Sequence, residues 1–191
     1  MASIPVASLD ALQKHHKLLQ VVQETTSSVF ATMLGVTVTP LHISLEKQST
    51  VSNAGLTAMV GMAGPVSGSG CLAMSKILAC YAASRFLMAE YPEVNDDVLD
   101  AVAEITNMIV GGLKTALEED LGPMGLSIPT VVFGENYVTR SPSMVERMVL
   151  SFRCEDDAIE EKEFTVTVCL VSEAQNRNYL RELAEFHSRL T

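Results

Sequence analysis

The chain has 191 residues, of which 48% are hydrophobic, so it can fold as one domain around a buried core. Its formal net charge of −10 argues against nucleic acid or anionic membrane as a partner, because both are bound through basic surface. No uninterrupted apolar run reaches the roughly 20 residues of a membrane-spanning helix. The N-terminus also lacks the basic-then-apolar order of a secretory signal. We therefore expect a cytoplasmic protein.

The four cysteines, Cys71, Cys80, Cys154 and Cys169, include no Cys-x-x-Cys pair. A chain of this size does not need disulfide bonds, so buried, reduced thiols are expected. Two adjacent histidines near the N-terminus would point about 100° apart on a helix, and no nearby cysteine or carboxylate completes a ligand set. The sequence therefore predicts no metal site.

The periodicity of apolar residues predicts the following elements in chain order. A long amphipathic helix over 8–34 is followed by β-rich stretches over 36–45, 51–62 and 68–74. A second helix fits 75–90, where Pro92 stops it, and a third covers 96–119. Three further strands are expected over 128–133, 144–153 and 163–171, before a terminal helix over 173–190.

This order, a helix, three strands and a helix, occurs twice. The segment 20–27 aligns with 100–107, and Cys71-Leu72 aligns with Cys169-Leu170. The offset grows from 80 to 98 residues, which places an insertion of 18 residues in the second half. The sequence thus predicts a single α/β (α+β) domain over 1–191, with pseudo-two-fold repeat halves at about 8–91 and 96–190. Six mainly antiparallel strands would form a sheet with long helices packed on it.

The third predicted helix carries a polar ridge. Asp100, Glu104, Asn107 and Gly111 are spaced i, i+4, i+7 and i+11, so they share one face of a helix, and apolar residues fill the opposite face. An asparagine and a glycine inside a helix both cost helix propensity. Gly111 and its neighbour Gly112 could leave a bare patch for the approach of another surface, or could pack against a neighbouring helix. The sequence alone leaves both interpretations open.

The spacing Asp100-x3-Glu104-x2-Asn107, with Pro129 after 21 intervening residues, resembles the signature of the CheC/CheX/FliY phosphatase family. The segment 125–134 is similar to the strand that follows this helix in the CheX branch. The resemblance covers nearly the whole order of elements. It implies a phosphatase that removes the aspartyl phosphate of a CheY-like response regulator.

The resemblance also implies roles for these residues. Asn107 would hold the attacking water in line with the acyl phosphate, and Glu104 would pair with the active-site lysine of the regulator. Asp100, Gly111 and Pro129 would support the site or contact the partner. Magnesium would arrive with the phosphorylated regulator, so this chain is expected to bind no cofactor of its own.

The first half departs from this pattern. Glu24 is kept, but Ser27 stands where the asparagine is expected and Gln20 stands where the aspartate is expected. A serine hydroxyl cannot present the donor and acceptor of an amide at the same reach. We expect a degenerate second site that does not catalyse. One working site per chain is similar to CheX, and that resemblance implies a homodimer.

Two other functions are alternatives to a phosphatase. A non-catalytic binding module, similar to the middle domain of the flagellar switch protein FliM, is the main alternative, although a scaffold has no need of the Glu104 and Asn107 pair. The glycine-rich segment 64–70 partly imitates a dinucleotide-binding fingerprint, but Pro65 and the strand pattern after it predict a turn between two strands. A small-molecule enzyme would also need a nucleophile with its base, or a cofactor loop, and neither is recognisable.

Overall fold

The computed structural model describes residues 6–46, 50–140 and 147–172. Its elements are α1 (Val6–Val29), η1 (Phe30–Leu34), β1 (Val38–Glu46), β2 (Thr50–Ala63), β3 (Val66–Met74), α2 (Lys76–Leu87), α3 (Asp96–Leu121), β4 (Gly125–Leu126), β5 (Thr130–Arg140), β6 (Arg147–Cys154) and β7 (Glu163–Ser172). The predicted mixed α+β single domain is confirmed. The helix predicted over 173–190 lies outside the described residues.

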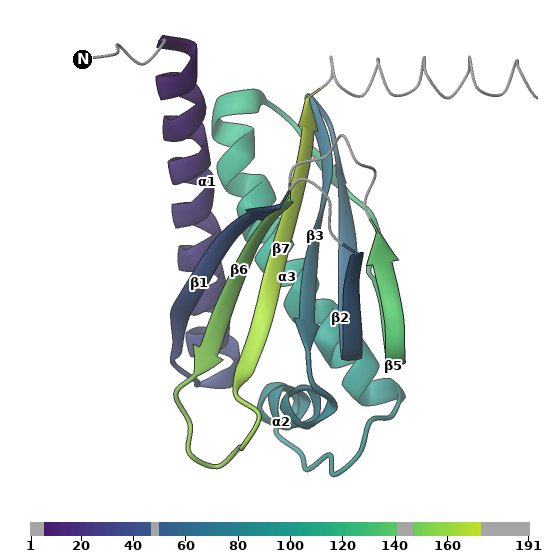
Figure 1. The fold of residues 1–191 in the computed structure, drawn as a ribbon. Helices are drawn as coiled ribbons and strands as arrows, with labels where there is room; N and C mark the ends of the chain where they lie inside the picture. Colours follow the sequence, from purple (N-terminus) through teal and green to yellow (C-terminus); the bar gives the residue numbers. More distant parts are fainter. Residues whose placement is uncertain (1–5, 47–49, 141–146, 173–191) are drawn as a thin grey trace, which may run out of the picture.

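The strands form one antiparallel sheet in the order β1-β6-β7-β3-β2, and both β4 and β5 pair with the outer edge of β2 (Figure 1). The third strand of each half, β3 or β7, lies at the centre of the sheet. The first strand of each half pairs with the second strand of the other half, as β1 with β6 and β5 with β2. Exchanging the two halves leaves this order unchanged, as a pseudo-two-fold repeat requires.

One face of the sheet is apolar because alternate residues of each strand point the same way. Leu72 in the central strand β3 pairs with Ala58 of β2 on one side and with Val166 of β7 on the other. Leu150 of β6 continues this row, and all four side chains are at most 1% exposed. The period-two pattern of the sequence therefore sets which face of the sheet is covered.

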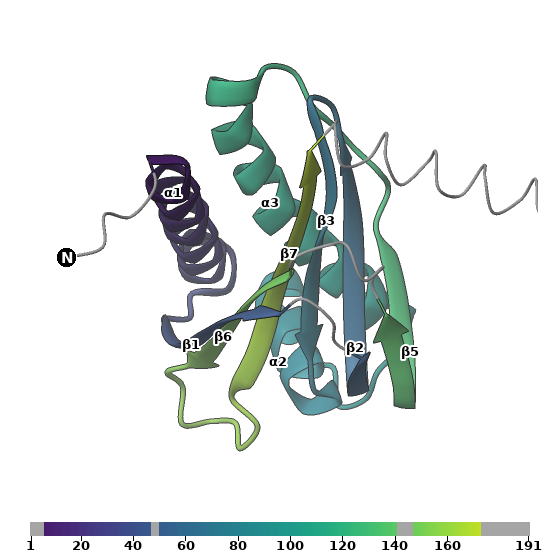
Figure 2. The same cartoon turned by 45° about the horizontal axis from the view of Figure 1, so that its top comes forward.

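The helices lie on that apolar face, and α3 crosses the sheet diagonally (Figures 1 and 2). Gly70 of β3 lies directly under Val110 of α3, and a methyl group added at Gly70 would overlap the Val110 side chain. A glycine at this point lets the helix approach the centre of the sheet closely. The position of α3 above the sheet is therefore fixed where β3 has no side chain.

The first helix ends differently from the prediction. Residues 8–34 were expected to form one helix, whereas α1 ends at Val29 and a π-helical turn, η1, continues to Leu34. Gly35 stops this turn with a left-handed φ of 66°, and its N–H donates to the Phe30 carbonyl. Phe30 is fully buried and stacks on Phe164 of β7, with ring centroids 4.6 Å apart. The π-turn therefore brings Phe30 into the core.

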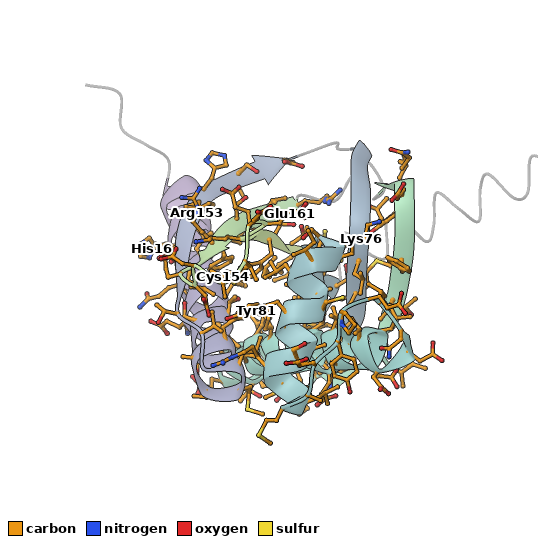
Figure 3. All side chains as sticks on the ribbon, turned by 90° about the horizontal axis from the view of Figure 1, so that it is seen from below. His16, Lys76, Tyr81, Arg153, Cys154 and Glu161 are labelled. Atoms are coloured by element: carbon orange, nitrogen blue, oxygen red, sulfur yellow. The ribbon has the colours of Figure 1, made fainter. Side chains whose placement is uncertain are left out.

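The second helix is tied to the connection between β6 and β7. The Ser75 hydroxyl caps α2 by accepting the Leu78 N–H, as a serine at the N-cap does. The hydroxyl of Tyr81, on the underside of the molecule, donates to the carboxylate of Asp156 (Figure 3). Burial raises the pKa of Tyr81, and this hydrogen bond raises it further, to about 12. A bond between residues 75 positions apart thus holds α2 against the turn.

All four cysteines are free thiols, as predicted, and Cys80, Cys154 and Cys169 are buried. No helix in the described part of the chain combines the length and apolar character needed to cross a membrane.

Candidate functional site on helix α3

Helix α3 begins at a strong local signal. The Asn95 side chain accepts a hydrogen bond from the Val98 N–H at 3.0 Å, which satisfies one of the free donors at the helix start. Asp96 and Asp97 lie in the first turn, where carboxylates interact favourably with the helix dipole. The sequence therefore fixes the start of the helix that carries the predicted site residues.

The side of α3 that faces the core consists of buried apolar side chains. Val98, Val102, Ile105, Ile109 and Leu113 are each at most 3% exposed. Their burial fixes the rotation of the helix about its axis, because an apolar stripe packs inward and leaves the opposite face outward.

The predicted polar ridge faces outward as a consequence. Asp100 and Glu104 are exposed, and Asn107 and Gly111 are half-buried. Neither the Glu104 nor the Asn107 side chain has a hydrogen-bond or ion-pair partner among the described residues. A carboxylate and an amide one turn apart are thus free to meet groups from another molecule.

The two glycines after this ridge have different environments. A Cβ at Gly112 would overlap the side chain of Thr25 on α1, so Gly112 belongs to the crossing of the two long helices. A Cβ at Gly111 would meet nothing closer than Leu126 Cδ1, at 3.9 Å. The interpretation of a bare patch is therefore wrong for Gly112, which packs against a helix, and is retained for Gly111.

The chain returns from α3 along the edge of β2, and Pro129 lies in a bulge of this return. Gly61 exchanges backbone and side-chain hydrogen bonds with Ser127, while Met59 pairs with Thr130. Two residues, Ile128 and Pro129, therefore lie opposite the single residue between Gly61 and Met59, which is the definition of a β-bulge. The strand predicted to begin at 128 begins at Thr130 instead.

Pro129 causes the bulge, and the bulge leaves Ile128 exposed. Proline has no backbone N–H to donate, so Pro129 cannot continue the ladder. Pro129 itself is half-buried, whereas the Ile128 side chain is 86% exposed. The site residues predicted from the sequence include Pro129 but not Ile128. The Ile-Pro step directly before a strand is the signal that could have indicated the bulge.

The corresponding residues of the first half are arranged differently. The Gln20 amide donates to the Glu24 carboxylate at 3.0 Å, so this glutamate is engaged within its own helix. Ser27 is half-buried on the same helix. The first half thus presents neither a free carboxylate nor an amide at the matching positions.

Comparison with known proteins identifies the family. The profile of a family described as chemotaxis phosphatase CheX matches residues 56–153, more than half of the 191-residue chain. The matched segment contains Asp100, Glu104, Asn107, Gly111 and Pro129, and excludes Glu24 and Ser27. A search of curated protein sequences found no significant match.

Solved structures agree with this match. A CheX chemotaxis protein from Desulfovibrio desulfuricans superposes with a TM-score of 0.71 at 25% identity, covering 81% of this chain and 99% of that one. A chain of the CheX–CheY–BeF3–Mg2+ complex from Borrelia burgdorferi superposes with a TM-score of 0.59 at 25% identity, covering 80% of this chain and 97% of its own. FliM from the H. pylori FliM–SpeE complex, at 14% identity and a TM-score of 0.61 over 92% of this chain and 95% of its own, shares the fold alone. The chain belongs to the CheX family of chemotaxis phosphatases.

Proposed function

We propose that this protein accelerates hydrolysis of the aspartyl phosphate on a CheY-like response regulator. The observation that carries the proposal is the pair Glu104 and Asn107, which lies on the outward face of α3 without a partner among the described residues. The pair lies inside the segment that matches the CheX family. The relative from Borrelia burgdorferi, which forms a complex with CheY, BeF3 and Mg2+, supports a CheY-like partner.

Asn107 is the residue that positions water. An amide is both a donor and an acceptor, so one side chain can hold a water molecule and fix its orientation. In the reaction, the water oxygen bonds to phosphorus as the bond from phosphorus to the aspartyl oxygen breaks, and a carboxylate and inorganic phosphate are released. The barrier to this reaction responds mainly to orientation and charge stabilisation, so a positioned amide suffices as the contribution of this chain.

Glu104 sets the docking register. It lies one turn before Asn107 and is exposed, so its carboxylate can pair with the lysine of the regulator's active site. Asp96, Asp97 and Asp100 are also exposed along the first half of α3, so the approach to the pair is acidic. Mg2+ enters the reaction with the regulator and neutralises charge on the phosphoryl group. The side chains of this chain supply orientation and one complementary charge.

The first half carries a degenerate copy of this site. Glu24 is engaged with Gln20, and Ser27 lacks the reach and the paired donor and acceptor of an amide. We therefore assign one working site to each chain. A homodimer is part of the same proposal and rests on the family resemblance; light scattering of the purified protein measures it directly.

The proposal is tested by phosphate release from a phosphorylated CheY-like regulator. Wild-type protein should accelerate release, and Asn107→Ala should abolish the acceleration while it keeps the same melting temperature and still binds the regulator loaded with BeF3 and Mg2+. Full acceleration by Asn107→Ala would overturn the assignment of the water-positioning residue. Binding of the regulator by wild type without any acceleration would instead identify a non-catalytic module.

A further inference from the structure

We infer that Ile128, raised by the Pro129 bulge, is the apolar docking contact that this site offers to the response regulator. The inference rests on the function proposed above and adds a residue that determines partner affinity. It combines three observations: the bulge, the exposure of the isoleucine and the position of both beside the α3 ridge.

The bulge holds Ile128 rigidly. The Ser127 hydroxyl accepts the Gly61 N–H at 2.8 Å and donates to the Ile128 carbonyl at 2.9 Å, and the Ser127 N–H donates to the Gly61 carbonyl at 2.9 Å. Pro129 fixes the backbone on the other side, because its ring locks φ. An exposed side chain between two fixed residues loses little further backbone entropy on binding, which favours affinity.

The return of the chain brings Ile128 close to the α3 ridge. Leu126 lies beside Gly111, one turn after Asn107 on α3, and from there the chain runs back along the helix (Figure 1). Four helical residues from Gly111 to Asn107 span about 6 Å. The two residues from Leu126 to Ile128 span at most about 7 Å, so Ile128 stays close to this part of the ridge. Ile128 is therefore two residues along the chain from a contact with the ridge that carries the amide.

An exposed isoleucine at this position suits a partner surface. At 86% exposure, Ile128 leaves nearly all of its apolar side chain in water, and β-bulges near active sites commonly redirect a side chain. The ridge beside Ile128 is polar and acidic. The surface therefore combines an apolar residue with surrounding charged residues, which is the usual composition of a protein interface. Continuity with Glu104 and Asn107 identifies the occupant as the regulator.

The chain contains a matched control for this residue. Leu41 of β1 also occupies a bulge beside a proline, since Pro40 pairs with Phe152 and His42 with Ser151, and it is 44% exposed. Strand β1 lies at the opposite edge of the sheet from β5. Leu41→Ser therefore removes an exposed aliphatic side chain from a similar bulge that is far from the ridge.

The test measures affinity and turnover separately. Binding of the BeF3- and Mg2+-loaded regulator is titrated for wild type, Ile128→Ser and Leu41→Ser, and phosphate release is followed at saturating regulator. We expect Ile128→Ser to weaken binding roughly tenfold, from the loss of one buried aliphatic side chain, with kcat unchanged. Leu41→Ser should match wild type in both measurements.

The outcomes separate this inference from the function on which it rests. Wild-type affinity in Ile128→Ser, with normal acceleration by wild type, would overturn the docking contact alone. A change in the oligomeric mass of Ile128→Ser, measured by light scattering, would also overturn it, because the isoleucine would then be covered by a second copy of the chain. Absence of both acceleration and regulator binding by wild type would defeat the proposed function and the docking contact with it.

Discussion

Gly112 of α3 lies against Thr25 of α1, and the space between them does not admit a methyl group. This contact sets how closely the two long helices approach each other. Gly111, the preceding residue, faces Leu126, and the space between these two residues does admit a methyl group. Two adjacent glycines of the same helix thus differ in whether a side chain fits, which gives a matched pair for testing the geometry that holds the candidate site.

Gly112→Ala should destabilise the protein by about 1–3 kcal/mol, because the added methyl group forces α1 and α3 apart. Gly111→Ala should instead stabilise it by up to about 1 kcal/mol, because alanine is the better helix former and space is present. Thermal or urea unfolding of the two variants measures the difference. Equal effects of the two substitutions would contradict the helix crossing described here.

Glu104→Gln should weaken binding of the regulator more than it slows the bound reaction. The substitution removes the charge that we pair with a lysine while it keeps the shape and exposure of the side chain. We expect at least a tenfold rise in KM and a smaller salt dependence of kcat/KM, since the charge that responds to salt is lost. A fall in kcat at unchanged KM would place Glu104 in the chemical step instead.

Ser27→Ala should leave phosphate release within about twofold of wild type. Ser27 is half-buried beside a glutamate that is already engaged with Gln20, so this part of α1 lacks the groups that catalysis needs. The assay is the one used for Asn107→Ala, at the same concentrations of regulator. A loss in Ser27→Ala comparable to that of Asn107→Ala would show two working sites per chain.

The contribution of Tyr81 to stability should depend on acid pH. The hydroxyl of Tyr81 and the N–H of Ala158 both donate to Asp156 and lower its pKa. A carboxylate with a lowered pKa stabilises the folded state above its unfolded pKa of about 3.9, and this contribution is lost as the pH falls through the lowered value. Tyr81→Phe should therefore be less stable than wild type at pH 7. The difference in their free energies of unfolding should become smaller below about pH 4.

A control separates this titration from the general effect of acid. Tyr137→Phe removes a hydroxyl that is hydrogen-bonded to Thr57, at 2.6 Å, and a threonine does not titrate in acid. The difference in free energy of unfolding between Tyr137→Phe and wild type should stay constant over the same pH range. If the difference in free energy of unfolding between Tyr81→Phe and wild type also stays constant, Asp156 does not stabilise the fold through its charge.

The cysteines should react slowly with a thiol reagent in the native protein. Burial raises the pKa of Cys71 to about 11 and that of Cys154 to about 12, and the thiolate is the reactive form. At pH 8 we expect release of reporter from Ellman's reagent to be at least tenfold slower in buffer than in denaturing urea. Rapid reaction of Cys80, Cys154 and Cys169 in buffer would contradict their burial.

The sequence alone determined the two faces of α3. Burial of Val102 and Ile105 and exposure of Glu104 follow from a periodicity that is local to the helix. The cap at Asn95 is equally local, because its side chain accepts the N–H of Val98 three residues later. The alternation that makes one face of the sheet apolar is local in the same way. The candidate site on α3 can be predicted from the sequence because its residues are neighbours on a single helix.

Only the tertiary structure decided which strands pair and which glycine fits its neighbour. The exchange of first strands between the halves, the contact of Gly112 with Thr25 and the position of Gly70 under Val110 all join residues far apart in the chain. The outward turn of Ile128 depends on the register between the return segment and β2. Pairing register depends on the partner strand and on what covers the sheet, so no periodicity within one segment specifies it.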